Sequence, residues 1–308
     1  MFDIWLPIAQ QKMNVFLLCG FGLGVGFLSG FFGVGGGFIM TPLLMALGVP
    51  PSVAVGSGLA IMLGASLSGT VRHTQLGTVD FKLALLLLPG SFLGVQAGAI
   101  LLNALKTTGS FHFNGGAINT AHFFLSLCFM ALLFGVGIST LFESSPAPAA
   151  SPDVHVTPPL ALRMQGLRLP PYISLNGSGV DRFPFLFILV GGLLVGVMAG
   201  LLGVGGGILM LPFMMYFIGI KAHRAVGTSL CQICFTAAFG AVIHARLGNV
   251  DPILAIVVLA GSLVGARLGA STTSKVHSLH LRRYFALFSV AVGLVVGISF
   301  IRELFFRH

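Results

Sequence analysis

Apolar residues gather in ten runs along this chain, five before residue 143 and five after residue 183. The first five cover 14–32, 36–48, 52–72, 80–104 and 117–142, and the other five cover 184–202, 206–219, 223–244, 250–271 and 284–301. An α-helix needs about 20 apolar residues to cross a bilayer, so the long runs predict membrane-spanning helices. The second run of each set is too short to span, and we expect a half-helix or re-entrant segment there.

Composition narrows the class of protein. The chain has 308 residues, of which 56% are hydrophobic and only 7% are charged. Soluble domains carry about 25% charged residues, so the sequence predicts an all-α, polytopic transmembrane bundle in a cell membrane, the bacterial inner membrane. The net charge of +9 comes largely from short loops between apolar runs, which is typical of membrane topology signals. We expect the lipid bilayer as a partner and no nucleic acid.

The second set of runs repeats the first. Residues 29–37 read SGFFGVGGG, and residues 199–207 read AGLLGVGGG. The segment HTQLGTVD, ending at Asp80, likewise matches HARLGNVD, ending at Asp251. Because these matches include polar positions, the sequence predicts two homologous transmembrane repeats, 14–142 and 184–301. A polar, proline-rich linker at 143–183 joins them, and its composition is typical of a mobile segment.

The direction of the two repeats depends on how the short second runs are arranged. If every run crosses, or if the first two runs of each repeat form a re-entrant hairpin, the repeats are inverted. If those two runs make one broken span, the repeats are parallel. Two of the three arrangements are inverted, and inverted repeats, each with a glycine-broken or re-entrant helix, are our prediction.

Glycines also recur every four residues in two runs of each repeat. This spacing places them on one helix face and lets a second helix approach closely. The ladders are Gly22, Gly26, Gly30, Gly90, Gly94 and Gly98 in the first repeat, and Gly192, Gly196, Gly200, Gly261, Gly265 and Gly269 in the second. We interpret them mainly as helix-packing positions.

The two GVGGG clusters interrupt apolar runs and are the strongest candidates for a site. They lack the third glycine of the dinucleotide fingerprint, and no Lys-Ser/Thr pair follows, so a nucleotide loop is excluded. Freed amides at the start of the next half-helix can cradle an anion; the alternative is a tight turn between helices. The candidate positions are Gly33, Gly35, Gly36, Gly37, Gly203, Gly205, Gly206 and Gly207.

Polar side chains inside the apolar runs are further candidates for substrate contact. Ser57 and its repeat partner Thr228, which precedes Ser229, carry hydroxyls that could contact a substrate or bond their own helix backbone. Arg267, whose repeat partner is Gln96, lies inside a predicted span, where a charge is costly and indicates function unless it reaches the interface. The absence of deep acidic residues favours an anionic substrate.

Repeat-related histidines and aspartates flank short loops at helix ends. His73 and His244 can titrate near neutral pH, so we assign them, with Asp80 and Asp251, to gating or coupling. The competing interpretation is structural, with histidines anchoring the loops and aspartates capping helices.

Two cysteines, Cys231 and Cys234, share one helical face. A redox role is one interpretation, but the repeat partner of Cys231 is Ala60, which favours simple packing. Zinc-ligand spacing is absent, so we expect no metal and no cofactor.

The glycine clusters, the Pro42 and Pro212 that follow them, the Ala-Val-Gly-Ser/Thr segments and the Leu-Gly-x-Val-Asp loops together resemble the TauE/SafE family of sulfite-exporter-like membrane proteins. The resemblance covers 14–142 and 184–301. It implies a secondary transporter of sulfite or a related organosulfur or carboxylate anion. The linker at 143–183 is longer than the resemblance implies.

The functional prediction is therefore a membrane transporter and not an enzyme. We expect an exporter of a small anion that works by alternating access, with its site at the midplane where the repeats meet. An anion channel, a membrane redox protein using Cys231 and Cys234, and a non-transporting scaffold are the alternatives. A homodimer is compatible with the sequence.

Overall fold

The computed structural model describes residues 2–113, 116–143, 158–167, 169–175, 179–273, 276 and 278–306, and most of them are helical. The elements before the linker are β1 (Asp3–Leu6), β2 (Gln11–Asn14), α1 (Val15–Phe32), α2 (Gly37–Ala46), α3 (Pro51–Gln75), α4 (Phe81–Thr107), β3 (Ser110–Phe113), β4 (Gly116–Asn119) and α5 (Thr120–Glu143). Those from the linker onward are α6 (Pro159–Gln165), β5 (Tyr172–Leu175), β6 (Val180–Pro184), α7 (Phe185–Leu202), α8 (Gly207–Pro212), the π-helical turn η2 (Phe213–Ile218), α9 (Ala222–Arg246), α10 (Pro252–Thr273) and α11 (Ser278–Phe306).

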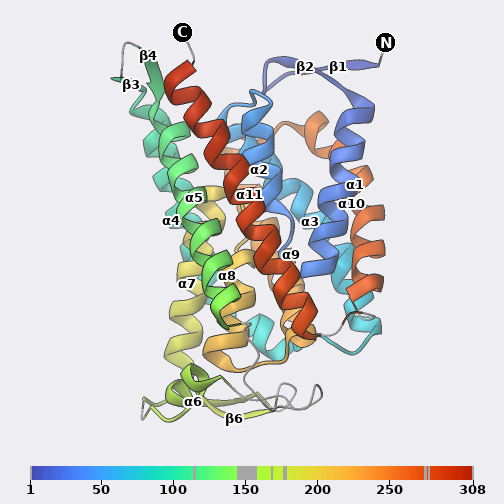
Figure 1. The fold of residues 1–308 in the computed structure, drawn as a ribbon, viewed down its shortest axis with the longest axis vertical. Coiled ribbons are helices and arrows are strands. Elements are labelled where there is room, and N and C mark those ends of the chain that lie inside the picture. Colours follow the sequence, from blue (N-terminus) through green and yellow to red (C-terminus); the bar gives the residue numbers. More distant parts are fainter. Residues whose placement is uncertain are drawn as a thin grey trace.

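The helices form one elongated bundle. Both chain termini lie at one end of it, and α6 and β6 lie at the other (Figure 1). Within the described residues, seven helices are long and apolar enough to cross a membrane: α1, α3, α4, α5, α7, α9 and α10. The segments Gly37–Ala46 and Gly207–Ile218 are apolar but shorter, which confirms the prediction of a half-helix in each repeat.

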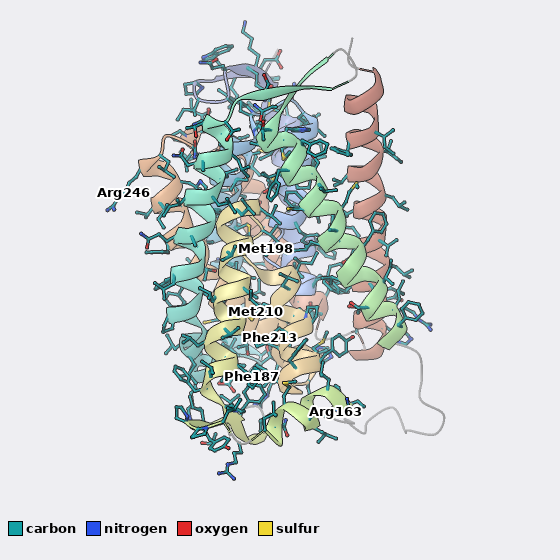
Figure 2. All side chains as sticks on the ribbon, turned by 90° about the vertical axis from the view of Figure 1, so that its left-hand side faces the viewer. Arg163, Phe187, Met198, Met210, Phe213 and Arg246 are labelled. Atoms are coloured by element: carbon teal, nitrogen blue, oxygen red, sulfur yellow. The ribbon has the colours of Figure 1, made fainter. Side chains whose placement is uncertain are left out.

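Polar side chains concentrate toward the ends of the bundle. Arg163, on α6, and Arg246, at the end of α9, lie toward opposite ends, whereas Phe187, Met198, Met210 and Phe213 lie between them (Figure 2). The apolar middle and charged ends match the profile of a bilayer.

The prediction of a purely helical chain was incomplete, because the structure also contains strands. Three two-stranded antiparallel sheets pair β1 with β2, β3 with β4, and β5 with β6. All three are short, and they lie at the ends of the bundle, outside its helical middle (Figure 1).

Part of the predicted linker is ordered. Helix α6, strand β5 and all of β6 except Pro184 fall within 143–183, and Ala161 and Phe183 are fully buried. Residues 144–157 of the predicted mobile stretch lie outside the described residues. The linker therefore contributes packed structure at the end of the bundle that holds α6 and β6.

The glycine ladders interlock helices from the two halves of the chain. Gly26 of α1 lies against the backbone of Ser262 on α10, and Gly265 of α10 lies against the backbone of Leu23 on α1. A Cβ atom at either glycine would overlap with that backbone. The ladders on α4 and α7 pack in the same way, with Gly94 against Leu193. These contacts fulfil the predicted packing role and join each half to the other through two close helix pairs.

Helices α5 and α11 pack against each other and border α2. The ring of Phe288 on α11 stacks with Phe32 at the end of α1 and meets Phe38 on α2 edge to face. Phe32 and Phe38 are buried. Aromatic packing therefore joins the α5–α11 pair to the segment that contains the first glycine cluster.

Candidate functional site

Both glycine clusters end one helix and begin another. Helix α1 stops at Gly33 with a φ of 72°, and Gly35 and Gly36 have φ values of 78° and 73°. The second cluster repeats this geometry, with φ values of 68°, 65° and 83° at Gly203, Gly205 and Gly206. Left-handed backbone favours glycine, which explains the glycines at these positions of both clusters.

The two breaks meet in the interior. A Cβ atom at Gly37 would overlap with the carbonyl oxygen of Gly203, and one at Gly207 would overlap with that of Val34. Met62 on α3 and its repeat partner Ile233 on α9 each lie against both Gly35 and Gly205. The structure therefore brings the two breaks together, and four of the eight predicted glycines lie against Met62 or Ile233: Gly35, Gly37, Gly205 and Gly207.

Every residue of the two breaks is buried. At the first break, the amide of Gly33 donates to Ser29, and the amides of Ile39 and Met40 donate to Gly36. The second break repeats this pattern from Ala199 to Met210. The intervening amides have no acceptor among the described residues: Val34, Gly35, Gly36, Val204, Gly205 and Gly206. Buried amides without acceptors are rare, so the centre of the bundle has unused donors.

Hydroxyl groups hold carbonyl oxygens of the breaks. Ser229 donates to the carbonyl oxygen of Gly33 and also to that of Val226, at 2.9 Å. Thr41 donates to Gly203 at 3.3 Å, and Thr236 is 3.4 Å from the carbonyl oxygen of Gly205. Ser229 was among the predicted site residues, but Thr41 was not. Its repeat partner is Leu211, so comparison of the repeats carried no signal for it.

Ser57 and Thr228 do not reach the centre; each instead fixes a loop of the other half. The amide of Asp251 donates to the Ser57 hydroxyl at 2.9 Å, and the amide of Asp80 donates to Thr228 at 2.9 Å. Both hydroxyls are fully buried. The substrate-contact role predicted for them stays untested, and the contacts support a structural role.

The predicted gating residues lie at helix ends. Asp80 accepts from the amide of Leu83 at 3.1 Å, and Asp251 accepts from that of Leu254 at 3.1 Å, so each caps the helix that follows it. Asp251 also accepts from the amides of Ile8 and Ala9. These contacts match the structural alternative for the aspartates.

His73 and His244 contact the last helical turn before each break. The Nε2 atom of His73 is 3.4 Å from the carbonyl oxygen of Gly30, and that of His244 is 2.9 Å from Gly200. Both histidines are buried. Gly30 and Gly200 each lie three residues before the first glycine of the break, so the histidines are adjacent to the breaks but do not line them. Their coupling role remains a prediction.

Gln96 and Arg267 are exposed on the outer sides of α4 and α10. Gly265 and Gly269 mark the packed face of α10, and residue 267 lies about 200° around the helix from Gly265. The structure therefore does not bring these two side chains to the breaks. The glycine ladder carried the signal for this orientation, and the predicted anion contact remains untested.

The cysteines of the redox alternative lie on α9. Cys231 is buried, Cys234 is half-buried, and both are free thiols. Neither is among the residues that contact the breaks, so their position supports the packing interpretation.

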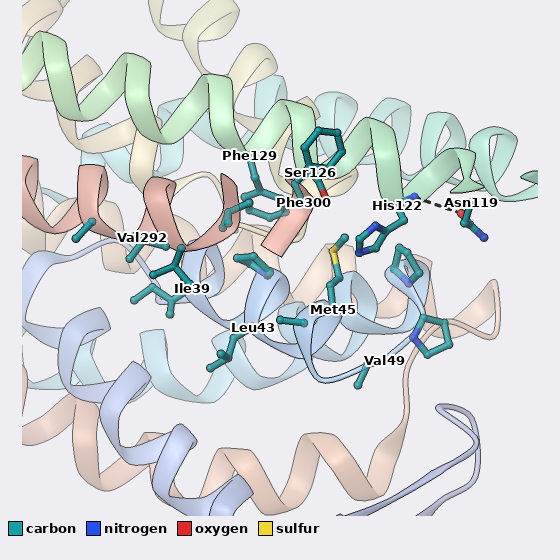
Figure 3. Close-up of a pocket in the computed structure, with 18 of the residues that line it drawn as sticks. Ile39, Leu43, Met45, Val49, Asn119, His122, Ser126, Phe129, Val292 and Phe300 are labelled. Atoms are coloured by element: carbon teal, nitrogen blue, oxygen red, sulfur yellow. Dashed lines mark hydrogen bonds between the residues drawn. The ribbon is translucent and has the colours of Figure 1, made fainter. Parts of the chain in front are cut away.

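A cavity of about 790 Å³ lies between α2, α5 and α11. Ile39, Leu43, Phe129 and Val292 surround it, and Asn119, His122 and Ser126 lie along its α5 side (Figure 3). Sequence reasoning missed it, because the helices that line it are distant along the chain.

The sequence is similar to those of known membrane proteins. Residues 18–296 match the family model described as "Sulfite exporter TauE/SafE". The probable membrane transporter protein YjnA of Bacillus subtilis (strain 168) is 28% identical over 273 residues, which cover 89% of this chain and 96% of that protein. The probable membrane transporter protein YunE of the same organism is 26% identical, with 91% of this chain and 96% of that protein covered.

A plant protein also matches part of the chain. The sulfite exporter TauE/SafE family protein 3 of Arabidopsis thaliana is 33% identical over 89 residues, which are 29% of this chain and 19% of that protein. No solved structure matches the chain. The family match spans both sets of apolar helices and both glycine breaks, so the chain belongs to the TauE/SafE sulfite exporter family and is a multi-pass membrane transporter.

Proposed function

We propose that this protein is a secondary transporter, and specifically an exporter, of a small anion such as sulfite or an organosulfur or carboxylate compound. The observation that carries the proposal is the meeting of two half-helix starts in the interior, each preceded by amides without acceptors. The substrate would bind between the breaks, with those amides as hydrogen-bond donors.

Electrostatics favour an anion at this position. Helix α2 and the segment Gly207–Ile218 both begin at the breaks, and a helix start carries roughly half a positive charge. Two such starts together supply about one positive charge, and the low dielectric of the interior strengthens its effect. The hydroxyls of Ser229, Thr41 and Thr236 contact carbonyl oxygens of the same breaks, and by rotating they could donate to an anion instead.

We further propose that the two halves are inverted repeats. Helix α1 follows the N-terminal strands at the end of the bundle that holds both termini, whereas α7 follows β6 at the other end (Figure 1). The first half-helix would then face one side of the membrane and the second the other. This arrangement supports alternating access around a fixed midplane site.

The packing suggests which parts would move. Met62 and Ile233 fill the space between the breaks, so substrate entry requires them to be displaced. The glycine ladders lock α1 to α10 and α4 to α7 across the two halves. We therefore propose that the half-helices move against these locked pairs, and that neither half moves as one rigid body. The filled centre supports a transporter over the alternative of an open channel.

The proposal is tested in proteoliposomes with labelled sulfite. We expect the double variant Gly36→Leu plus Gly206→Leu to lose transport and sulfite-dependent thermal stabilisation, because leucine is strained at a positive φ. Gly24→Leu is the control, since a side chain there meets open space.

A milder variant keeps the test decisive if the double variant does not fold. Ser229→Ala removes one hydroxyl beside the first break, and we expect about three- to tenfold weaker sulfite binding. Unchanged sulfite affinity in Ser229→Ala would contradict the proposed site. Non-saturating current in planar bilayers would instead indicate the channel.

A further inference from the structure

The cavity between α2, α5 and α11 plays no part in the proposed transport site. Its lining includes Leu28 on α1 and runs from Ile39 on α2 to Val49 and Pro50 in the loop after α2, but it contains no residue of either break. Its volume of about 790 Å³ falls within the range of about 300–1,000 Å³ typical of small-molecule sites.

Most of the cavity is apolar. Phe129 closes it on the α5 side, Phe288 and Val292 form the α11 wall, and Ile39 and Leu43 form the α2 wall. The lining contains no Asp, Glu, Lys or Arg among the described residues. Such a surface accommodates a hydrocarbon chain and would disfavour a small inorganic ion.

One side of the cavity is polar. Asn119, His122 and Ser126 are spaced by three and four residues at the start of α5, so they share one helical face. Ser126 is only 5% exposed and lines the cavity, and its hydroxyl takes part in none of the hydrogen bonds found among the described residues. This hydroxyl can therefore donate to a ligand that carries an acceptor oxygen.

The start of α5 strengthens the preference for an anionic acceptor. The side-chain oxygen of Asn119 accepts from the amides of Ala121 and His122 at 3.0 and 3.2 Å (Figure 3). This capped start of a 24-residue helix carries partial positive charge. A carboxylate near His122 and Ser126 would be stabilised by that charge and by the Ser126 hydroxyl.

The cavity opens on an apolar flank of the bundle. Ala46, Ala291 and Val295 line it and are also exposed, Val295 to 59%. In a membrane this flank faces lipid, so a molecule can enter from the side. We propose that the cavity binds one single-chain carboxylic acid from the bilayer, with its carboxylate at His122 and Ser126 and its chain against Phe129, Phe288 and Val292.

The site is tested with tritiated palmitic acid and protein in phosphatidylcholine nanodiscs, with binding to empty nanodiscs subtracted. We expect saturable binding of about one molecule per chain. Val292→Trp fills the cavity and is expected to weaken binding at least about tenfold. Its control is Leu294→Trp, a lipid-exposed position on the same helix outside the cavity.

A second pair of variants tests the polar end with little change in packing. Ser126→Ala is expected to weaken binding about three- to tenfold, the effect of one hydrogen bond. Ser139→Ala is its control, because that hydroxyl bonds its own helix at Gly135 and is exposed. Competition by methyl palmitate should be much weaker than competition by palmitic acid.

Three outcomes would overturn the inference. The first is equal palmitate binding by the wild type, Val292→Trp and Ser126→Ala. The second is equal competition by the methyl ester, which would exclude recognition of a carboxylate. The third is a wild-type dimer that Val292→Trp converts to a monomer, with no saturable palmitate binding by either protein, which would assign the cavity to a contact between copies. None of these outcomes bears on the proposed sulfite site, which the glycine and Ser229 variants test separately.

Discussion

Replacing the hydroxyl of Thr228 separates a structural role from substrate contact. In Thr228→Val the side chain keeps its shape but can no longer accept from the amide of Asp80, which it does now at 2.9 Å. Both groups are buried, so the amide is left without that partner. We expect a less stable protein whose folded form binds substrate with normal affinity.

Two ranges of hydrogen-bond energies set the expected loss of stability. A buried donor that loses its partner costs about 1–3 kcal/mol in soluble proteins. Hydrogen bonds inside membrane proteins average about 0.6 kcal/mol and reach about 1.7 kcal/mol, because the unfolded state in the membrane also finds partners. The loop that contains Asp80 connects α3 to α4 near the end of the bundle, so we expect about 1–2 kcal/mol for Thr228→Val. The repeat-related change Ser57→Ala should have a similar effect through Asp251.

The assay measures both quantities on one preparation. Free energies of unfolding come from denaturation in mixed micelles, and sulfite affinity comes from ligand-dependent stabilisation of the same variants. Thr272→Val is the matched control, because the Thr272 hydroxyl donates only to Leu268 in its own helix, at an exposed site. The reasoning is refuted if Thr228→Val unfolds like the wild type. It is equally refuted if stability is kept and sulfite binding falls tenfold or more, since that result assigns Thr228 to the substrate.

Two further changes test the packing. Gly94→Leu places a side chain against the backbone of Leu193 on α7 and should prevent correct assembly of the α4–α7 pair, measured as loss of the monodisperse peak in size-exclusion chromatography. Its control, Gly20→Leu, should behave as wild type, because a side chain there meets open space. Equal yields of the two variants would contradict the interlocked glycine ladders. Asp251→Ala removes the acceptor for the amides of Ile8 and Ala9 and should speed hydrogen–deuterium exchange in strands β1 and β2. Unchanged exchange there would show that the Asp251 carboxylate does not hold the N-terminal hairpin.

The glycine breaks show how far sequence reasoning reached. Their repetition predicted two helix interruptions followed by half-helices, and the structure confirms both. Left-handed backbone favours glycine over any other residue, so this feature is visible in a single sequence. The sequence also predicted a site where the two repeats meet. The contacts of Gly37 and Gly207, which join the two breaks, support this prediction.

The polar candidates show where sequence reasoning stopped. Ser57 and Thr228 follow the same repeated motif, but each accepts from the amide of an aspartate in the other half. Ser57 and Asp251 are 194 residues apart, and Thr228 and Asp80 are 148 residues apart. A repeat comparison shows that two positions correspond, whereas it does not show which half supplies the partner. Arg267 was assigned by its depth in a span, although the ladder glycines on either side already indicated the opposite face of α10.

The sequence by itself determined the membrane class, the half-helices that follow the glycine clusters, and the packing faces of the glycine ladders. Each of these depends on local properties: the length of apolar runs, the helical period, and the backbone conformations that only glycine adopts readily. Only the tertiary structure decided that Met62 and Ile233 fill the space between the breaks, that loops are fixed across the halves, and that α5 and α11 leave a cavity beside α2. Those features depend on which helix faces meet. Contacts between distant segments are set by the packing of the whole chain, so no single run of residues predicts them.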